Sequence, residues 1–509
     1  MRSLCLFLPL AFLAACTNSN KPLATATDSF YNEPHRPQIH FTPQAHWMND
    51  PNGMVYFNNQ YHLFYQYYPD STVWGPMHWG HATSKDLVRW QHQPVALFPD
   101  SLGYIFSGSA VADVNNTSGF GKDGKIPLVA LFTHHDPAGE KAGSSTYQNQ
   151  SIAYSLDEGK TWTKYAANPV LKNPGIKDFR DPKVMWYEPG KKWIMTLATL
   201  DHITFYSSPN LKDWKEESKI GKDFGAHGGV WECPDLFTLD HNGKKIWVLI
   251  VNINPGGPNG GSGTQYFTGQ FDGSKFIPYQ TDTRWLDYGP DEYAGITWSN
   301  TGDRKIFFGW MSNWLYANVV PTERWRSATT VPRDLGLEKI GDKYLITSKP
   351  VAELKALEET SKNVENINAA NYNFTKEVGA ISGPFQLRLS ADSIKDFSFS
   401  FSNKLGEKVV VGYNKAGNNY YIDRTKSGKV DFEKSFAARH TAPRFSTKQN
   451  FNCIMVVDNA SIELFADDGL STMTEIFFPN EIFSTIHVQS PDNFTIKSLQ
   501  ITRYKSIWK

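Results

Sequence analysis

Short apolar, β-rich runs separated by turn residues dominate the body of the chain. Residues 54–57 and 61–66 are two such runs, and the polar residues 58–60 between them predict a β-hairpin. Residues 245–252 and 305–310 predict further strands. Helical periodicity is scarce, and residues 351–358 are the best short candidate for a helix. The pattern therefore predicts an all-β protein.

A degenerate repeat lies within this body. Residues 84–90, 155–162 and 208–214 each begin with Ser and end with Trp, and the last two follow β-rich runs. Repeats at about the length of a propeller blade favour a β-propeller, in which each four-stranded sheet packs on the next. Three chance Ser-Asp turns before a Trp are the alternative interpretation.

The pattern changes after about residue 350. Residues 397–402 alternate Phe and Ser strictly, so one face of the strand is buried and the other is wet. Residues 461–467 alternate in part. A chain of 509 residues exceeds a comfortable single core. We therefore assign residues 35–345 to the propeller, 346–360 to a linker that can form a helix, and 361–509 to a C-terminal β-sandwich.

The N-terminus differs from the rest. Arg2 precedes an apolar run over residues 4–15, which is too short for an ordinary transmembrane helix and suits a secretory signal. The run ends Leu13-Ala14-Ala15-Cys16, which resembles a bacterial lipobox, where the signal is cut before the Cys and that Cys is lipidated. Residues 1–15 are thus predicted to be a signal peptide and residues 16–34 a lipid-anchored linker. An ordinary signal peptide with a chance Cys is the alternative.

Charge and cysteine content narrow the partners. The 51 basic and 51 acidic residues balance, and no basic tract that would attract nucleic acid is present. Aromatic residues make up 14% of the chain, which suits both β-structure and stacking on sugars. Beyond the signal and Cys16, only Cys233 and Cys453 remain, so neither a disulfide framework nor a metal cluster is predicted. We expect no cofactor, no metal and no nucleic-acid partner.

The most specific motif is residues 46–53, His-Trp-Met-Asn-Asp-Pro-Asn-Gly. It places one carboxylate, Asp50, among amide side chains, an indole and a Pro-Asn-Gly turn, which suits a polyhydroxylated ligand. A surface turn would explain the shorter Asn-Asp-Pro-Asn-Gly alone. The whole octapeptide resembles the signature of glycoside hydrolase family 32, the β-fructosidases, which include invertases, inulinases and levanases. The resemblance implies that Asp50 is the nucleophile.

Two further acids lie in distinctive segments, Asp181 within residues 178–183 and Glu232 within residues 231–237. Taken singly, Asp181 could form an ordinary ion pair and Glu232 could be a satisfied buried acid. Retaining glycosidases need two carboxyl groups about 5–5.5 Å apart. Because the three segments follow the order of the family, the resemblance implies Glu232 as acid/base and Asp181 as transition-state stabiliser, oriented by Arg180. It also implies five blades, whose radial strands bring the acids to one funnel, followed by a β-sandwich.

Other positions match those that line the fructose pocket in the family: Asn49, Gln66, Trp74, Ser107, Arg180 and Trp314. Trp74 and Trp314 could instead pack in the core. Residues 287–293 carry three acids and are interpreted as a loop of the funnel wall. Cys233 is expected to act on the surroundings of Glu232 rather than as a nucleophile.

The resulting hypothesis is retaining hydrolysis of β-fructofuranosidic bonds in fructans through a covalent fructosyl-enzyme. The substrate is levan, inulin or their oligosaccharides, with sucrose as a further candidate. A fructosyltransferase with the same triad and a non-catalytic fructan-binding propeller are the alternatives, and intact Asp50 and Glu232 argue against the second. Endo or exo action, β-2,6 or β-2,1 preference and the oligomeric state stay open. The lipid anchor is the expected membrane contact, at the cell surface (outer membrane) or in the periplasm.

Overall fold

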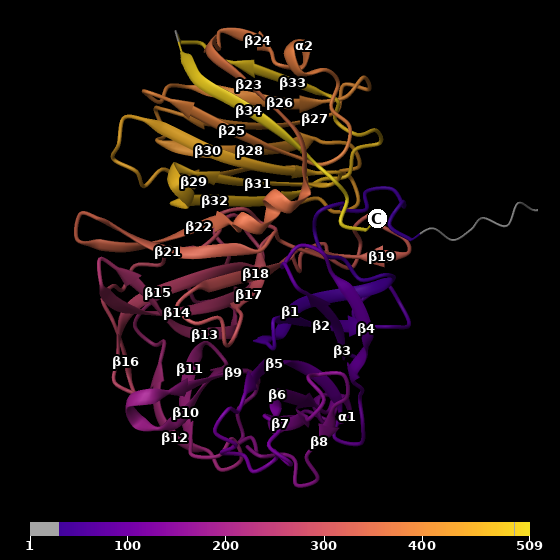
Figure 1. The fold of residues 1–509 in the computed structure, drawn as a ribbon, viewed down its shortest axis with the longest axis vertical. Coiled ribbons are helices and arrows are strands. Elements are labelled where there is room, and N and C mark those ends of the chain that lie inside the picture. Colours follow the sequence, from indigo (N-terminus) through magenta and orange to yellow (C-terminus); the bar gives the residue numbers. More distant parts are fainter. Residues whose placement is uncertain (1–29, 493, 509) are drawn as a thin grey trace, which may run out of the picture.

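The computed structural model describes residues 30–492 and 494–508. Figure 1 shows two stacked parts, with the sheets of the indigo to pink segments below and those of the orange and yellow segments above. The predicted signal peptide, Cys16 and most of the predicted 16–34 linker lie outside the described residues. Among the residues that are described, no helix has the length and apolar character needed to cross a membrane.

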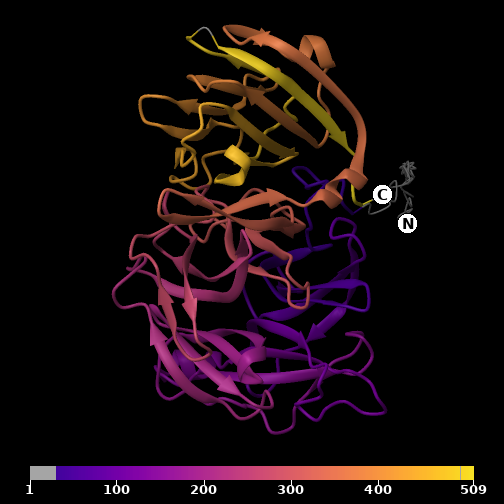
Figure 2. The same ribbon diagram turned by 60° about the vertical axis from the view of Figure 1, so that its left-hand side comes forward.

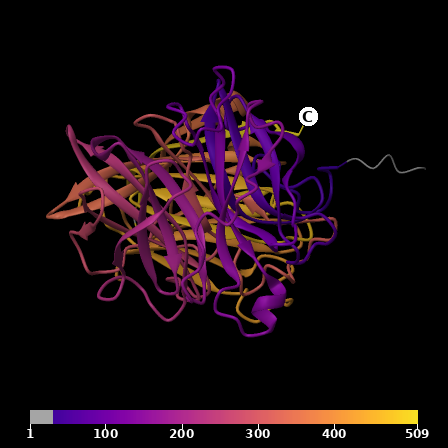
Figure 3. The ribbon, with the colours of Figure 1, turned by 90° about the horizontal axis from the view of Figure 1, so that it is seen from below.

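Five sheets form a β-propeller. Their innermost strands touch one another in the order β1-β5-β9-β13-β17, and β17 returns to β1, which closes the ring. These strands are β1 (His46–Phe57), β5 (Tyr104–Ala112), β9 (Phe179–Tyr187), β13 (Val230–His241) and β17 (Tyr293–Thr297). Seen from below, the blades lie in front of the sandwich (Figure 3). The predicted five-bladed propeller is confirmed.

Each blade continues outward by antiparallel pairing. The first adds β2 (Gln60–Tyr68), β3 (His78–Ser84) and β4 (Gln91–Leu97), and the second adds β6 (Leu128–His135), β7 (Gln148–Ser155) and β8 (Thr163–Lys164). The third adds β10 (Lys192–Thr199), β11 (His202–Ser208) and β12 (Lys215–Ile220), and the fourth adds β14 (Lys244–Asn254), β15 (Gly263–Phe271) and β16 (Phe276–Pro278). The fifth adds β18 (Lys305–Met311), β20 (Ala328–Thr329), β21 (Arg333–Ile340) and β22 (Lys343–Pro350). The late strand β19 (Trp325–Arg326) pairs in parallel with β1 and so ties the fifth blade to the first.

The degenerate repeat marks equivalent turns. Each copy joins the third strand of a blade to the fourth, in blades one, two and three. The Ser that opens each turn donates its hydroxyl to the acid or amide two residues on: Ser84 to Asp86 at 3.1 Å, Ser155 to Asp157 at 2.7 Å and Ser208 to Asn210 at 3.2 Å. Such side-chain bonds satisfy the polar groups of a tight turn. The repeat therefore does report the blade period.

The C-terminal part is a sandwich of two six-stranded sheets. The first holds β23 (Glu358–Asn368), β34 (Thr495–Tyr504), β25 (Phe385–Ala391), β30 (Phe451–Asp458), β31 (Ser461–Ala466) and β32 (Ser471–Ile476). The second holds β24 (Asn371–Asn373), β33 (Thr485–Gln489), β26 (Phe397–Ser402), β27 (Lys408–Asn414), β28 (Asn419–Lys426) and β29 (Arg439–Pro443). The short helical elements are α1 (Pro137–Lys141), η1 (Glu188–Gly190), η2 (Ala352–Leu357), α2 (Thr375–Val378) and η3 (Asp467–Gly469).

Burial in the sandwich follows the predicted alternation in β26 and departs from it in β31. Phe397, Phe399 and Phe401 are buried between the sheets, whereas the Ser residues between them are half-buried. In β31 all six residues are buried. The reason is that the second face of this strand packs on the propeller, where Glu463 forms a buried ion pair with Arg333 of β21.

The junction between the two parts is shorter than the predicted 346–360 linker. Strand β22 extends to Pro350, the 3-10 helix η2 follows, and β23 begins at Glu358. Two leucines of η2, Leu354 and Leu357, are buried against the propeller core. Figure 2 shows the fifth blade directly beneath the sandwich. At the other end of the chain, Tyr31, within the predicted 16–34 linker, stacks on Trp508 with ring centroids 4.0 Å apart.

Candidate functional site

All five innermost strands of the propeller carry a β-bulge at the same level. In each, two residues lie opposite one residue of the next strand: residues 49 and 50, 106 and 107, 181 and 182, 233 and 234, and 294 and 295. A bulge interrupts the ladder and re-aims the side chains around it. Asp181, Cys233 and Ala294 have left-handed φ angles of 64°, 41° and 54°, which are sparsely populated for such residues. The bulges thus turn several side chains toward one funnel.

A cavity of about 220 Å³ opens at this level. It contains all nine residues that the sequence predicts for the triad and the sugar pocket: Asn49, Asp50, Gln66, Trp74, Ser107, Arg180, Asp181, Glu232 and Trp314. Four blades and the loop after β18 supply them. The structure therefore brings together residues that lie far apart in the sequence.

Asp50 is held by short hydrogen bonds to both of its oxygens. Ser107 donates its hydroxyl to Oδ2 at 2.6 Å, and Asn49 donates its amide to Oδ1 at 2.9 Å. Trp47 fixes that amide by donating its indole N–H to Asn49 Oδ1 at 2.7 Å. Burial raises the pKa of Asp50 and the nearby Glu232 charge adds to it, whereas the bonds from Ser107 and Asn49 lower it. The carboxylate is immobilised and close to the charge of a second acid.

Asp181 shares a donor with Asp50. The backbone N–H of Cys233 donates to Asp181 Oδ2 at 3.0 Å. The Cys233 thiol lies 3.6 Å from that oxygen and 3.5 Å from Asp50 Oδ2. Burial, together with the charges of Glu232 and Asp50, raises the pKa of Asp181 to about 7. Burial also raises the pKa of the Cys233 thiol, so it stays protonated and serves as a weak donor between the two acids.

Glu232 is clamped from two sides. Arg180 donates to Glu232 Oε1 through Nε and Nη2 at 3.1 and 2.9 Å, and Tyr293 donates its hydroxyl to Oε2. The third Arg180 donor, Nη1, binds Asp178 at 2.6 Å. The expectation that Arg180 orients Asp181 is therefore corrected, since its hydrogen bonds go to Glu232 and Asp178. Neighbouring residues of a strand point to opposite sides, so Arg180 reaches across to the next blade.

Aromatic rings line the cavity beside the acids. Trp74 remains 39% exposed, so it forms a cavity wall rather than core. Trp314 stacks on the buried Trp47 with ring centroids 5.9 Å apart. Phe106 stacks on His135 at 4.2 Å and 9°. Flat apolar walls next to directed polar groups suit sugar rings, which present C–H faces and hydroxyl edges.

Sequence reasoning missed part of this lining and misplaced one loop. Five lining residues carried no recognisable signal: Phe106, His135, Glu140, Tyr147 and Gln148. Asp178 was visible only as the first residue of the Asp181 segment. The 287–293 segment faces the sandwich rather than the funnel, with Asp287 and Asp291 fully buried, and its last residue, Tyr293, contacts Glu232. Within residues 30–492 and 494–508, no group of three or more His, Cys, Asp or Glu side chains could hold a metal ion.

Comparisons with known proteins identify the family of both parts of the chain. Residues 40–350 match the N-terminal domain of glycosyl hydrolases family 32, and residues 353–503 match the C-terminal domain of that family. The levanase of Bacillus subtilis (strain 168) is 46% identical over 497 residues, which cover 95% of this chain and 72% of the levanase. The extracellular exo-inulinase of Aspergillus ficuum is 41% identical over 489 residues, which cover 88% of this chain and 90% of the inulinase.

Solved structures give the same result. The exo-inulinase of Aspergillus awamori has a TM-score of 0.86 at 38% identity, covering 94% of this chain and 100% of its own. The fructofuranosidase of Schwanniomyces occidentalis, complexed with fructose, has a TM-score of 0.84 at 33% identity, covering 94% and 100%. Together with the two domain matches and the acids gathered in one funnel, these similarities show that the chain belongs to glycoside hydrolase family 32.

Proposed function

We propose that this chain hydrolyses β-fructofuranosidic bonds in fructans with retention of configuration. The observation that carries the proposal is the pair of carboxyl groups in one funnel with different partners. Asp50 is fixed by Ser107 and Asn49, while Glu232 is clamped by Arg180 and keeps 19% of its side chain exposed. Both groups line the cavity, and their different partners suit one as a nucleophile and the other as the acid/base. The levanase and inulinase names of relatives support a fructan as substrate.

In the first step, Glu232 gives its proton to the glycosidic oxygen as the bond from that oxygen to the anomeric carbon breaks. Asp50 attacks the same carbon, and a covalent fructosyl-Asp50 forms. The step needs one proton among the acids at neutral pH. Burial and the neighbouring acidic charges raise the pKa of Asp50 and of Asp181, so the site disfavours simultaneous ionisation of its acids. Catalysis requires that proton on Glu232.

In the second step, Glu232 takes a proton from water, and the water oxygen attacks the anomeric carbon. The bond to Asp50 breaks, and fructose leaves with retained configuration. Arg180 and Tyr293 hold the Glu232 carboxylate for this task. Asp181 accepts hydroxyl hydrogens of the fructosyl unit, where bonds that tighten in the transition state add roughly several kcal/mol. Asn49, Gln66, Trp74, Ser107 and Trp314 complete the fructose pocket.

The test is chromatography of the products from levan, inulin and sucrose. Fructose alone from early times indicates exo action, and a ladder of oligosaccharides indicates endo action. The Glu232→Gln variant should lose at least about a hundredfold in rate, the lower range of general acid–base contributions. Glu359→Gln, at an exposed position, is the matched control and should keep wild-type activity.

Three outcomes would contradict the proposal. Full activity in Glu232→Gln would remove the acid/base assignment. Transfer of fructose to sugar in place of water would establish the fructosyltransferase alternative. Binding of fructan without any product would establish the non-catalytic alternative.

We also propose that the enzyme is exported and anchored by a lipid on Cys16, at the cell surface (outer membrane) or in the periplasm. The lipobox-like Leu13-Ala14-Ala15-Cys16 supports the anchor, and the relatives called extracellular support export. Changing Cys16→Ala should shift activity from the membrane fraction to the soluble fraction. Activity that stays in the membrane fraction would contradict the anchor.

A further inference from the structure

Two aromatic walls of the substrate funnel are attached to one long loop. We call residues 312–324, between β18 and β19, the strap. The strap carries Trp314, which lines the cavity. It also carries Asn318, whose Oδ1 accepts the backbone N–H of Trp74 at 2.9 Å. The position of the strap therefore determines where both tryptophans stand.

The strap combines exposed apolar residues with buried ones, among them Ala317 and Val320 at 0% and 4% exposure. Leu315 and Val319 are 48% and 50% exposed, so their burial adds little. Tyr316, in contrast, is 2% exposed, and its ring packs edge-on against Phe436 of the sandwich at 5.1 Å. Within the propeller, Arg326 holds the strap by donating to the carbonyls of Asn318, Val320 and Thr322. Tyr316, in contrast, attaches the strap to the sandwich.

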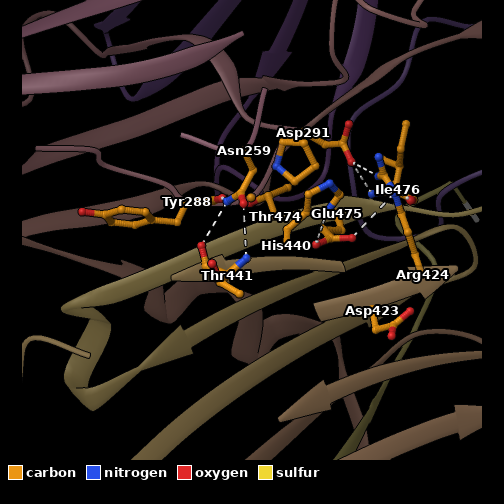
Figure 4. A network of polar contacts seen from close by, with 12 residues as sticks. Asn259, Tyr288, Asp291, Asp423, Arg424, His440, Thr441, Thr474, Glu475 and Ile476 are labelled. Atoms are coloured by element: carbon orange, nitrogen blue, oxygen red, sulfur yellow. Dashed lines mark hydrogen bonds and ion pairs between the residues drawn. The ribbon is translucent and has the colours of Figure 1, made fainter. Parts of the chain in front are cut away.

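The partner of Tyr316 is a buried arginine of the sandwich. Arg424, on β28, donates Nη2 to the Tyr316 hydroxyl at 2.9 Å and Nη1 to Asp291 Oδ2 at 2.5 Å. Tyr316 completes the triangle by donating to Asp291 Oδ1. The remaining Arg424 bonds go to the carbonyls of Phe436 and Ile476 at 2.7 and 3.1 Å. Figure 4 shows Arg424 directed from its strand toward Asp291 and Ile476.

A second bridge reaches the base of the strap. Asn259, in the loop after β14, donates to the carbonyls of Tyr288 and of Thr441 on β29, at 2.5 and 3.0 Å (Figure 4). Asn313, next to Trp314, donates to the Pro290 carbonyl at 2.7 Å. The propeller loops that carry Asn259 and Pro290 are thus bonded to the sandwich, through Thr441 and, at Asp291, through Arg424.

We infer that Arg424 is a positioning residue for substrate binding: through Asp291 and Tyr316 it fixes the strap, and so the Trp314 and Trp74 walls that receive fructan. The inference rests on the proposed function and assigns the sandwich a part in substrate recognition. A buried guanidinium with all its partners in place gives little net stability but strong geometric definition. The chemical step should change little, because the hydrogen bonds described for Asp50 and Glu232 come from outside the strap, which reaches Asp50 indirectly through the stack of Trp314 on Trp47.

The chain offers a matched control within the sandwich. Tyr420 donates its hydroxyl to Asp467 at 2.6 Å, and Arg444 binds the same tyrosine and aspartate at 3.2 and 2.8 Å. This Arg–Asp–Tyr triangle has the chemistry of the first but does not touch the strap. Tyr316→Phe and Tyr420→Phe each remove one buried hydroxyl and keep the ring.

The experiment measures kcat and KM on fructan oligosaccharides for the full-length wild type and both variants, well below their melting temperatures. Tyr316→Phe should raise KM about threefold to tenfold, the range set by one lost hydrogen bond, with kcat within about twofold. Tyr420→Phe should leave both constants unchanged. Unchanged KM in Tyr316→Phe, or equal rises in both variants, would overturn the inference.

Hydrogen exchange of residues 312–318 supplies a readout independent of catalysis. Tyr316→Phe and Arg424→Lys should both speed exchange there, and Tyr420→Phe should not. Protection that is unaltered in the first two variants overturns the inference even if the wild type proves inactive. A wild type that cleaves no fructan overturns the proposed function separately.

Discussion

Removing the Ser107 hydroxyl tests the proposed nucleophile. Ser107 donates to Asp50 Oδ2 at 2.6 Å, so Ser107→Ala withdraws a hydrogen bond from the charged form of that carboxylate. A hydrogen bond to a charged group contributes about 1.5–3 kcal/mol, and one pKa unit equals about 1.4 kcal/mol. The pKa of Asp50, already raised by burial, should therefore rise by about one to two further units. Because the attacking group must be ionised, the acidic limb of the activity profile should move to higher pH.

The assay is kcat/KM on a fructan oligosaccharide across the full pH range of stability. The limb of Ser107→Ala should lie about one to two pH units above that of the wild type. Ser109→Ala is the control, since Ser109 lies on the same strand and donates to the Pro182 carbonyl at 2.9 Å instead of to an acid. A uniform loss of kcat/KM at every pH, with the limb in place, would refute the reasoning and assign Ser107 to sugar binding alone.

Four further outcomes follow from the site. Tyr293→Phe removes a donor to Glu232 and should lower kcat by at least about tenfold, measured at saturating fructan; an unchanged kcat would contradict the role. Asp181→Asn should abolish activity. At pH values above 7, however, this variant should melt at a higher temperature than the wild type. The pKa of Asp181 is about 7 against an ordinary 3.8, so its ionisation costs on the order of a few kcal/mol of stability at neutral pH. That cost should shrink as pH falls from 7 toward 3.8, and equal melting curves at pH 8 would count against it. Iodoacetamide should leave activity intact, since Cys233 is buried and its pKa is raised; inactivation by it would show a reactive thiol. EDTA should not reduce the rate, because the described part of the chain has no cluster of metal-ligating side chains; a loss restored by a divalent cation would refute this.

Local patterns predicted the elements whose environment is set by neighbours in sequence. The Phe-Ser alternation of β26 gave the buried face, and the three Ser-to-Trp turns gave the blade period. The sequence patterns failed where contact with the other part of the chain decides which residues are buried. Strand β31 is buried on both faces because the propeller covers the side that the pattern left polar, and Glu463 finds its partner 130 positions away in Arg333.

The site shows the same division. Motifs with several fixed residues, such as 46–53, located the acids, and all nine named residues meet in one cavity. The hydrogen-bond partners of the acids were harder to predict, because the sequence does not show that Arg180 reaches across to Glu232 on the next blade. Phe106 and Glu140 lie in segments with no unusual composition, and only the three-dimensional path of β5 and α1 carries them to the cavity.

The five bulges make the funnel sensitive to one kind of genetic change more than to another. Residues 233 and 234 together face Val251, so loss of one of them would restore one-to-one pairing. Glu232 would keep its pairing with Asn252, but the extra residue that bends the strand and re-aims the side chains around it would be lost. A substitution at the same level leaves the bulge and the pairing of the strand in place. In evolutionary terms, the innermost strands can exchange side chains and thereby acquire new specificities, whereas single-codon deletions there erase the site.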